Sequence, residues 1–285
     1  MKSRGEQSVQ LRDMTPGDLV AAHELSRAAQ WPHRLEDWKF MLRAGLGVIA
    51  ERDGAVVGTA MGWPYGADAA TLGMVIVSRD CRGGGVGRKL MNAVIERLGE
   101  RSILLNATED GLALYKSMGF VTVGGVHQHQ GTVLSVPVAS LRPGERVRPM
   151  GSTDQAAIVE LDTQAGGMSR GKLFATLMKT AKGVVLDLDG EAVGFALIRP
   201  FGLGYSIGPV IARDAQGARA LISHWLGSKA GSFTRLDLSY DGGLSAWLEG
   251  LGVAAVGRVV TMVRGKAPAR EGSVATFAVI SQALG

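Results

Sequence analysis

The sequence is poor in cysteine, in aromatic residues and in long apolar runs, and each scarcity excludes something. Its one cysteine, Cys81, rules out an internal disulfide and suits a reducing compartment, so we expect a cytoplasmic protein. Because the sequence has no apolar run of about 18 residues, we expect no membrane span or membrane partner. The polar start Met1–Gln10 predicts no secretory signal. Aromatic residues make up only 6% of the chain and basic residues are scattered, which argues against a nucleic-acid partner.

Apolar residues and glycine are plentiful. The chain has 285 residues, of which 46% are hydrophobic, and this is enough for two domains with cores of their own. The formal net charge of +5 suits an anionic ligand.

The most informative glycines lie in the segment Val77–Arg88, whose sequence is V-S-R-D-C-R-G-G-G-V-G-R. An apolar strand, Met74–Val77, leads into it, and an amphipathic helix pattern, Val86–Leu98, leads out. Unpaired amides and the positive end of the helix dipole therefore converge on a loop without side chains. This arrangement predicts a phosphate-binding site.

The spacing of these glycines excludes two common phosphate loops. A dinucleotide fingerprint fails because Arg88 or Leu90 stands where its third glycine belongs, and Gly87 is not followed by the Lys-Ser/Thr of a P-loop. What remains is Arg-x-x-Gly-x-Gly, formed by Arg82, Gly85 and Gly87. A glycine-rich turn without a ligand is the alternative interpretation.

The rest of the first half alternates predicted strands and helices. A glycine closes a short helix and a strand follows it, giving the ending Leu-Tyr-x-x-x-Gly-Phe from Leu114 to Phe120. The predicted elements are a hairpin over Gly47–Met61 with its turn at Asp53-Gly54, strands Thr71–Val77 and Leu104–Ala107, a helix Gly111–Met118 and a strand from Phe120.

These two signatures, in this order, resemble those of the GNAT-type N-acetyltransferases over roughly Gln10–Leu134. The resemblance implies an α/β (α+β) fold with two tandem GNAT-like domains, each a mixed, mostly antiparallel sheet flanked by helices. It also implies acetyl-CoA as co-substrate and no metal.

The resemblance further assigns residues to roles. Tyr115 is the general acid that protonates the departing thiolate, although it is alternatively a core aromatic. A bulge eased by Gly73 exposes strand amides to the thioester oxygen and the pantetheine arm. The co-substrate-binding residues implied are Val75, Ile76, Val77, Arg82, Gly83, Gly84, Gly85, Val86, Gly87, Arg88 and Asn106.

The general base is left open, because Ala69–Val77 contains no acidic residue where many family members have one. A chain of water molecules would also serve, and the pair of histidines is alternatively an exposed feature of an edge strand. The candidates are Glu51, Asp68, Glu109, His127 and His129.

The second half echoes the first. Asp53-Gly54 matches Asp189-Gly190 at an offset of 136 residues, and other matches drift only slightly from that offset. The polar segment Ser140–Glu145 marks the expected boundary, giving a catalytic domain at 1–140 and a GNAT-like domain at 141–285.

The second half departs from the first at the loop and at the tyrosine. The alignment sets Ala215–Ala220 against Arg82–Gly87, so that side chains would crowd the loop, and Trp247 against Tyr115. The chain thus resembles tandem acetyltransferases with one active and one degenerate unit, the latter forming a wall of the substrate cleft or a dimer surface. Ala29–Trp38 also resembles a stretch of those proteins.

The leading hypothesis is an N-acetyltransferase acting on the primary amine of a small molecule. The alternatives are a non-catalytic acyl-CoA sensor and a protein N-acetyltransferase, while a covalent route through Cys81 has little support. The apolar stretch Val274–Leu284 either packs on the second domain or pairs subunits of a homodimer. Four aromatic residues are candidates for the substrate cleft or the core: Trp31, Trp38, Trp63 and Tyr65.

Overall fold

The computed structural model describes residues 9–239 and 243–285, and its two halves repeat one order of elements. The first eight residues, on which most of the signal-peptide prediction rests, lie outside this part. The first half has β1 (Gln10–Asp13), α1 (Leu19–Ala28), α2 (Leu35–Ala44), β2 (Leu46–Arg52), β3 (Ala55–Tyr65), β4 (Ala69–Val77), α3 (Val86–Leu98), β5 (Ser102–Ala107), α4 (Glu109–Ser117) and β6 (Val121–Thr132). The second half has β7 (Glu145–Pro149), α5 (Gln155–Gly166), α6 (Gly171–Leu177), β8 (Lys182–Leu188), β9 (Glu191–Phe201), β10 (Gly204–Ala212), α7 (Ala215–Ser228), β11 (Phe233–Ser239), α8 (Ser245–Gly250), β12 (Ala254–Arg264) and β13 (Ala275–Ala278).

The predicted hairpins are confirmed in both halves. Asp53 and Gly54 have φ values of 52° and 77°, and Asp189 and Gly190 have 52° and 96°. Two consecutive left-handed residues make the tight turn that matches the twist of the flanking strands. The repeated Asp-Gly pair therefore marks the same turn, between β2 and β3 and between β8 and β9.

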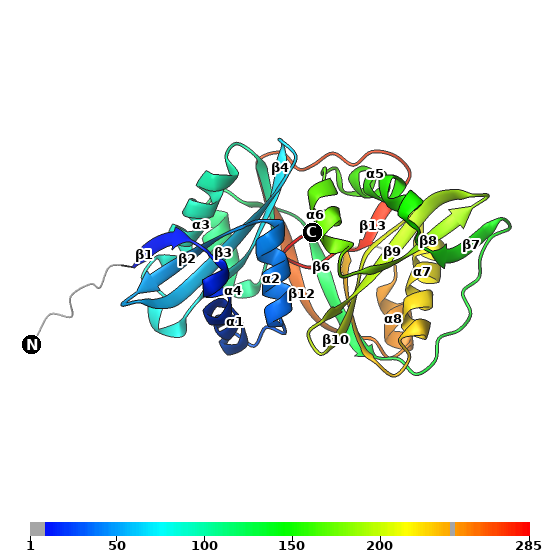
Figure 1. Cartoon of the computed structure of the whole chain (residues 1–285), viewed down its shortest axis with the longest axis horizontal. Helices are drawn as coiled ribbons and strands as arrows, with labels where there is room; N and C mark the ends of the chain where they lie inside the picture. Colours follow the sequence, from blue (N-terminus) through cyan, green and yellow to red (C-terminus); the bar gives the residue numbers. More distant parts are fainter. Residues whose placement is uncertain (1–8, 240–242) are drawn as a thin grey trace, which may run out of the picture.

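Thirteen strands of the described chain form one sheet, in the order β1-β2-β3-β4-β5-β12-β6-β11-β13-β10-β9-β8-β7. Near its centre the halves exchange strands: β12 pairs with β5, and β6 lies between β12 and β11 (Figure 1). Only β4–β5 and β10–β11 are parallel pairs among the described strands, so the predicted mostly antiparallel fold is confirmed. The division at residue 140 falls between β6 and β7 and stays a prediction.

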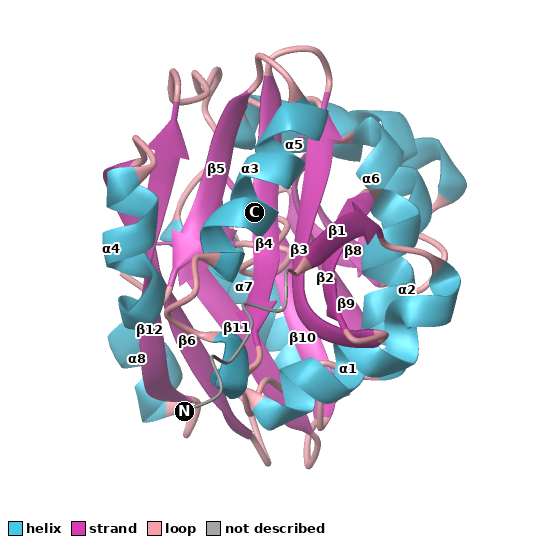
Figure 2. Cartoon of the chain, turned by 90° about the vertical axis from the view of Figure 1, so that its left-hand side faces the viewer, coloured by secondary structure: helices cyan, strands magenta, loops and turns pink. Residues whose placement is uncertain are grey.

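Helices cover both sides of the sheet (Figure 2). One apolar cluster lies under α3, a second lies under α7, and a third joins both halves through α1, α2, α5 and α6. Trp38 and Trp63 are fully buried in the shared cluster and Tyr65 is 3% exposed. These three side chains belong to the core, which is the second of the two roles expected for them, and they do not line a substrate cleft. No helix in the described ranges has the length and apolarity needed to cross a bilayer.

The start of α2 meets β9 of the second half in a buried contact. Arg34 donates through Nη2 to the main-chain oxygen of Pro200 at 2.8 Å, and an Arg199 nitrogen lies 3.4 Å from an Asp37 oxygen. The His33 ring packs edge-on against Phe201, with ring centroids 5.3 Å apart. The pair of halves is thus held by charge and aromatic packing besides the exchanged strands.

His33 gives the stability of this contact a pH dependence. Burial lowers the pKa of His33 from 6.5 to about 3, so the folded chain keeps it neutral while the unfolded chain protonates it. Its contribution is therefore complete above pH 6.5 and is lost as the pH falls toward 3. Between pH 7 and pH 4 we expect the unfolding free energy of wild type to fall by about 1–3 kcal/mol more than that of His33→Gln in urea denaturation. Equal pH slopes would contradict this.

Candidate active site

The glycine loop between β4 and α3 leaves a helix terminus bare. Gly83 and Gly85 have φ values of 81° and 74°, and no described atom lies within 4 Å of where a Cβ would stand on either. Gly85 is the N-cap residue of α3, and no side chain caps the helix there. The first amides of α3 and the positive end of its dipole therefore face open space, an arrangement that fits a phosphate.

Two arginines join this loop to α4. Arg82 donates through Nε to the main-chain oxygen of Val77 at 3.3 Å, and its Nη1 lies 4.0 Å from an Asp110 oxygen. Arg88 donates through Nη2 to Oγ of Ser117 at 2.6 Å. Both guanidinium groups remain partly solvent-accessible, so each adds positive charge beside the bare amides.

The strand β4 leaves part of its edge unpaired. It pairs with β5 only from Ala69 to Thr71, opposite Ser102 to Leu104, and then the two parallel strands diverge. Residues Val75–Val77 lie beyond that point, where Val75 and Val77 pack on the α3 side and Ile76 packs on the other. Apart from the main-chain oxygen of Val77, which accepts from Arg82, main-chain groups facing the gap are available to an extended ligand that adds itself as a strand.

The expected irregularity in β4 exists, but Gly73 does not carry it. The register between β3 and β4 shifts between Thr59 and Met61, and the residue with positive φ is Met74, at 53°. Oγ1 of Thr59 supports this conformation by donating to the main-chain oxygen of Met74 at 2.8 Å. Gly73 serves packing instead, since a Cβ there would lie 3.1 Å from the Cβ of Ala283.

Tyr115 lies on α4, half-buried, with its ring over Gly111 and edge-on to Phe120 at 6.2 Å. A Cβ on Gly111 would lie 2.6 Å from the tyrosine ring, so glycine at this position makes room for it. The hydroxyl has no hydrogen-bond partner among the described residues, and burial raises its pKa to about 12. The phenol is therefore protonated at neutral pH, and none of the described residues accepts a hydrogen bond from it.

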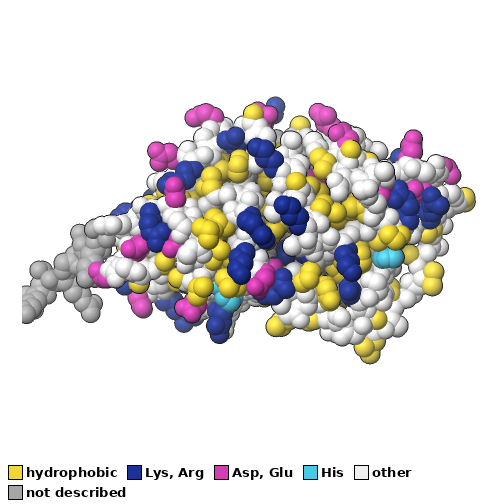
Figure 3. Space-filling model, viewed as in Figure 1, with side chains coloured by type: hydrophobic (Ala, Val, Ile, Leu, Met, Phe, Trp, Pro, Cys, Tyr) yellow, Lys and Arg dark blue, Asp and Glu magenta, His cyan; other side chains and the backbone are white. Residues whose placement is uncertain are grey.

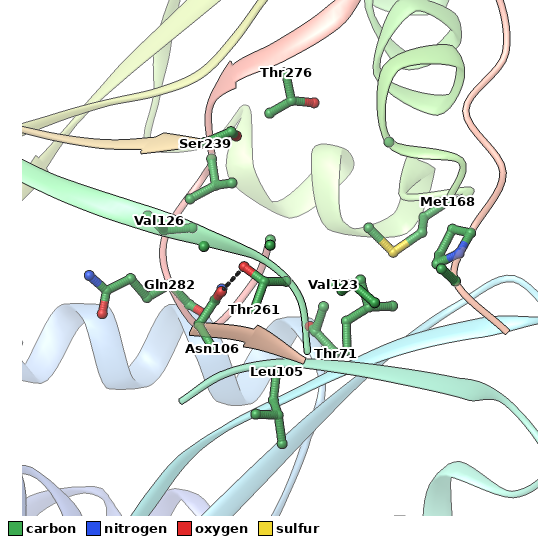
Figure 4. A pocket seen from close by; sticks show the side chains of 18 of the residues that line it. Thr71, Leu105, Asn106, Val123, Val126, Met168, Ser239, Thr261, Thr276 and Gln282 are labelled. Atoms are coloured by element: carbon green, nitrogen blue, oxygen red, sulfur yellow. Dashed lines mark hydrogen bonds between the residues drawn. The ribbon is translucent and has the colours of Figure 1, made fainter. Parts of the chain in front are cut away.

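Asn106 lies on β5 beyond the divergence, and its amide is held by the second half. It donates through Nδ2 to the main-chain oxygen of Gln282 at 2.8 Å and accepts from Oγ1 of Thr261 at 2.7 Å. Figure 4 shows these side chains around a cavity of about 370 Å³, which we call the interdomain pocket. Its wall also includes Thr71 and Leu104, the last paired residues of β4 and β5.

The corresponding helix terminus in the second half is already occupied. The helix α7 begins at Ala215, directly after Asp214, whose carboxylate accepts from the amide of Gly217 at 3.0 Å. Arg142 donates to the same carboxylate at 2.7 Å. Reading Ala215–Ala220 as a crowded loop was therefore wrong. Those residues are the first turns of α7, and a carboxylate takes the place of an anionic ligand.

The gap between β10 and β11 is also filled, by β13. The two strands pair only at Tyr205 and Ser206, and β13 then enters between them. It pairs with β10 through Ala275 and Thr276, and Ala278 lies opposite both β10 and β11. The apolar stretch from Val274 to Leu284 thus packs back into the protein. This agrees with the first of the two predicted alternatives, packing on the second domain.

Family models match both halves of this chain. The model of the acetyltransferase (GNAT) family matches residues 12–120, and that of an acetyltransferase (GNAT) domain matches residues 158–277. The chain belongs to the GNAT acetyltransferases, in tandem form. It is also similar to the uncharacterized N-acetyltransferase YitH of Bacillus subtilis, with 28% identity over 220 residues, which is 75% of this chain and 76% of YitH.

Solved structures of tandem length share the fold of this GNAT protein. A protein of Pyrococcus horikoshii assigned as an acetyltransferase matches with a TM-score of 0.80 and 18% identity, over 100% of this chain and 99% of that one. A tandem GNAT protein from the clavulanic acid biosynthesis pathway matches with a TM-score of 0.64 and 15% identity, over 91% of this chain and 99% of that one.

The candidate bases of this GNAT protein are scattered, and none of them lines the interdomain pocket. Glu51 pairs with Arg12 on the outer strands at 3.0 Å. His129 is fully buried, and its Nε2 contacts Oγ of Ser245 at 2.7 Å. Asp68 and Glu109 are exposed, at the β3–β4 turn and at the start of α4.

Two further features bear on the chemistry. The thiol of Cys81 is buried under α3, at 6% exposure. No group of three His, Cys, Asp or Glu side chains in the described ranges is placed to hold a metal ion. The hydrogen bond from Asn106 to the main-chain oxygen of Gln282 was not predicted, because no local sequence pattern at either residue indicates it.

Proposed function

We propose that this protein transfers an acetyl group directly from acetyl-CoA to the primary amine of a small molecule, using one active site in the first half. The contrast between the two halves carries the proposal. In the first, a bare helix terminus follows a strand with an open edge, whereas Asp214 and β13 fill both places in the second.

The co-substrate would bind through main-chain groups. Its pyrophosphate fits the amides of Arg82–Arg88, with Arg82 and Arg88 adding charge. Its pantetheine arm fits the free edge of β4 at Val75–Val77. We further propose that Asn106 shapes the far side of this gap through its bonds to the second half.

In the reaction the amine nitrogen attacks the thioester carbon, and the oxygen gains negative charge that β4 amides after Met74 stabilise. The C–S bond then breaks, the new C–N bond remains, and the thiolate takes the proton of Tyr115. The nitrogen loses its extra proton to water or to a base, and the tyrosinate takes up a proton from water, which restores the tyrosine.

Calorimetric titration with coenzyme A tests the contrast between the halves. We expect one molecule bound per chain, because the helix terminus of α3 and the edge of β4 are open, whereas Asp214 and β13 fill the matching places in the second half. Two equivalent molecules per chain, or none, would overturn the proposal. Tight binding combined with no thiol release from acetyl-CoA in the presence of any amine would favour the alternative of a non-catalytic sensor.

The remaining expectations concern partners and location. Basic side chains are interspersed with apolar and acidic ones on the face shown in Figure 3, which supports a small-molecule acceptor over a nucleic acid. The single cysteine of the chain supports a cytoplasmic location. A homodimer stays a prediction, and the buried Val274 and Leu284 are not available for it.

A further inference from the structure

The interdomain pocket opens where the acetyl group would arrive. Thr71 and Leu104, the last paired residues of β4 and β5, belong to its wall, together with residues of α5 and of the segment after β12. The strands β6 and β12 contribute Val126 and Thr261 (Figure 4). An acceptor in this pocket would therefore reach the divergence of β4 and β5 from the side opposite α3.

The lining of the pocket has no Asp or Glu side chain among the described residues, but it has two arginines. Arg170 is already paired and is not available to a ligand. It forms a bidentate pair with buried Asp162 and donates to the main-chain oxygen of Gly285 at 2.7 Å. Arg270 is exposed and has no ion pair or hydrogen bond with any described residue. The pocket thus offers one unpaired positive charge to a ligand. It has no negative side chain that would bind an acceptor with several positive charges.

The backbone holds Arg270 in place from both sides. The main-chain oxygen of Ala269 and the ring of Pro268 occupy the space that a Cβ on Gly167 would need. On the other side, the amide of Glu271 donates to the main-chain oxygen of Gln164 at 3.0 Å. These contacts fix the main chain on both sides of Arg270, so the base of its side chain is held at the wall of the pocket.

We propose that the acceptor is an amine that carries its own carboxylate, as an amino acid does, and that Arg270 binds this carboxylate in the interdomain pocket. The inference rests on the proposed acetyl transfer and adds the acceptor class to it. A guanidinium forms two parallel hydrogen bonds with a carboxylate, which orients the acceptor as well as holding it. Apolar side chains of the lining, such as Val126 and Met168, receive the body of the molecule.

Matched acceptor pairs test this inference. Amino acids that have a primary amine and no side-chain carboxylate are each compared with the amine formed by decarboxylation, such as phenylalanine with phenethylamine and lysine with cadaverine, through thiol release from acetyl-CoA. We expect the amino acid of the best pair to be preferred in kcat/KM. The variant Arg270→Gln should raise the KM of that amino acid by about tenfold and leave that of its amine unchanged.

Two more variants sharpen the result. Arg270→Glu should reverse the preference within the pair. Arg213→Gln, which removes an exposed arginine outside the pocket, should leave the KM of both the amino acid and its amine unchanged. A preference for the amines, unaffected by either Arg270 variant, overturns the inference and leaves the acetyl transfer standing. If no amine of either series is acetylated although coenzyme A binds, the proposed function fails, and the acceptor class fails with it.

Discussion

The variant Tyr115→Phe is expected to lower kcat by about 100-fold or more while the affinity for acetyl-CoA stays nearly constant. The substitution removes one oxygen, and that hydroxyl has no partner among the described residues, so little packing is lost. The variant loses the proton that Tyr115 would give to the thiolate, so the thiolate would have to leave as an anion. Single-turnover measurements of thiol release, combined with titration of coenzyme A, separate the two effects.

A matched control is available in the second half. Tyr205 is also half-buried, and its ring lies 4.5 Å from the ammonium of Lys229. Tyr205→Phe should therefore leave kcat unchanged. An unchanged kcat in Tyr115→Phe would instead make Tyr115 a packing residue. Because burial raises the pKa of Tyr115 to about 12, the tyrosine should produce no loss of activity on the alkaline side below about pH 10.

Gly85→Asp is expected to weaken coenzyme A binding by about 100-fold or more. The new carboxylate would stand at the N-cap of α3, where Asp214 stands on α7 and accepts from the amide of Gly217. It would take the amides that the pyrophosphate needs and would repel the phosphate charge. Titration with coenzyme A measures the change directly.

The control for this variant is Gly54→Asp. Gly54 has a φ of 77°, close to the 74° of Gly85, and both positions open onto empty space. The backbone strain of a left-handed aspartate is therefore matched, while Gly54 lies in the β2–β3 turn. If both variants bind coenzyme A equally well, the α3 terminus is not the pyrophosphate site.

Local patterns predicted the local elements well. The helix Val86–Leu98 has the bounds expected from its apolar spacing, because the glycines before it and Gly99 after it end the pattern sharply. Both Asp-Gly turns are likewise confirmed, since their sequence determines their conformation.

Expectations that depended on distant partners were less successful. Gly73 was expected to ease the bulge in β4, yet Met74 takes the left-handed conformation with help from Thr59, a residue of another strand. The alignment of Ala215–Ala220 with the glycine loop was wrong because a shortened loop and a helix start look alike in a sequence of small residues. The pairing of β12 with β5 and the entry of β13 have no local signature at all.

The exchange of β6 and β12 makes the order of synthesis matter. The edge of β5 is completed by residues 254–264, which leave the ribosome long after β5 itself. A nascent chain therefore exposes an unsatisfied strand edge until nearly its whole length has emerged, and contacts this distant in sequence form slowly. Acetylating activity should appear only with the nearly full-length chain, and the first half expressed alone should tend to aggregate through that edge.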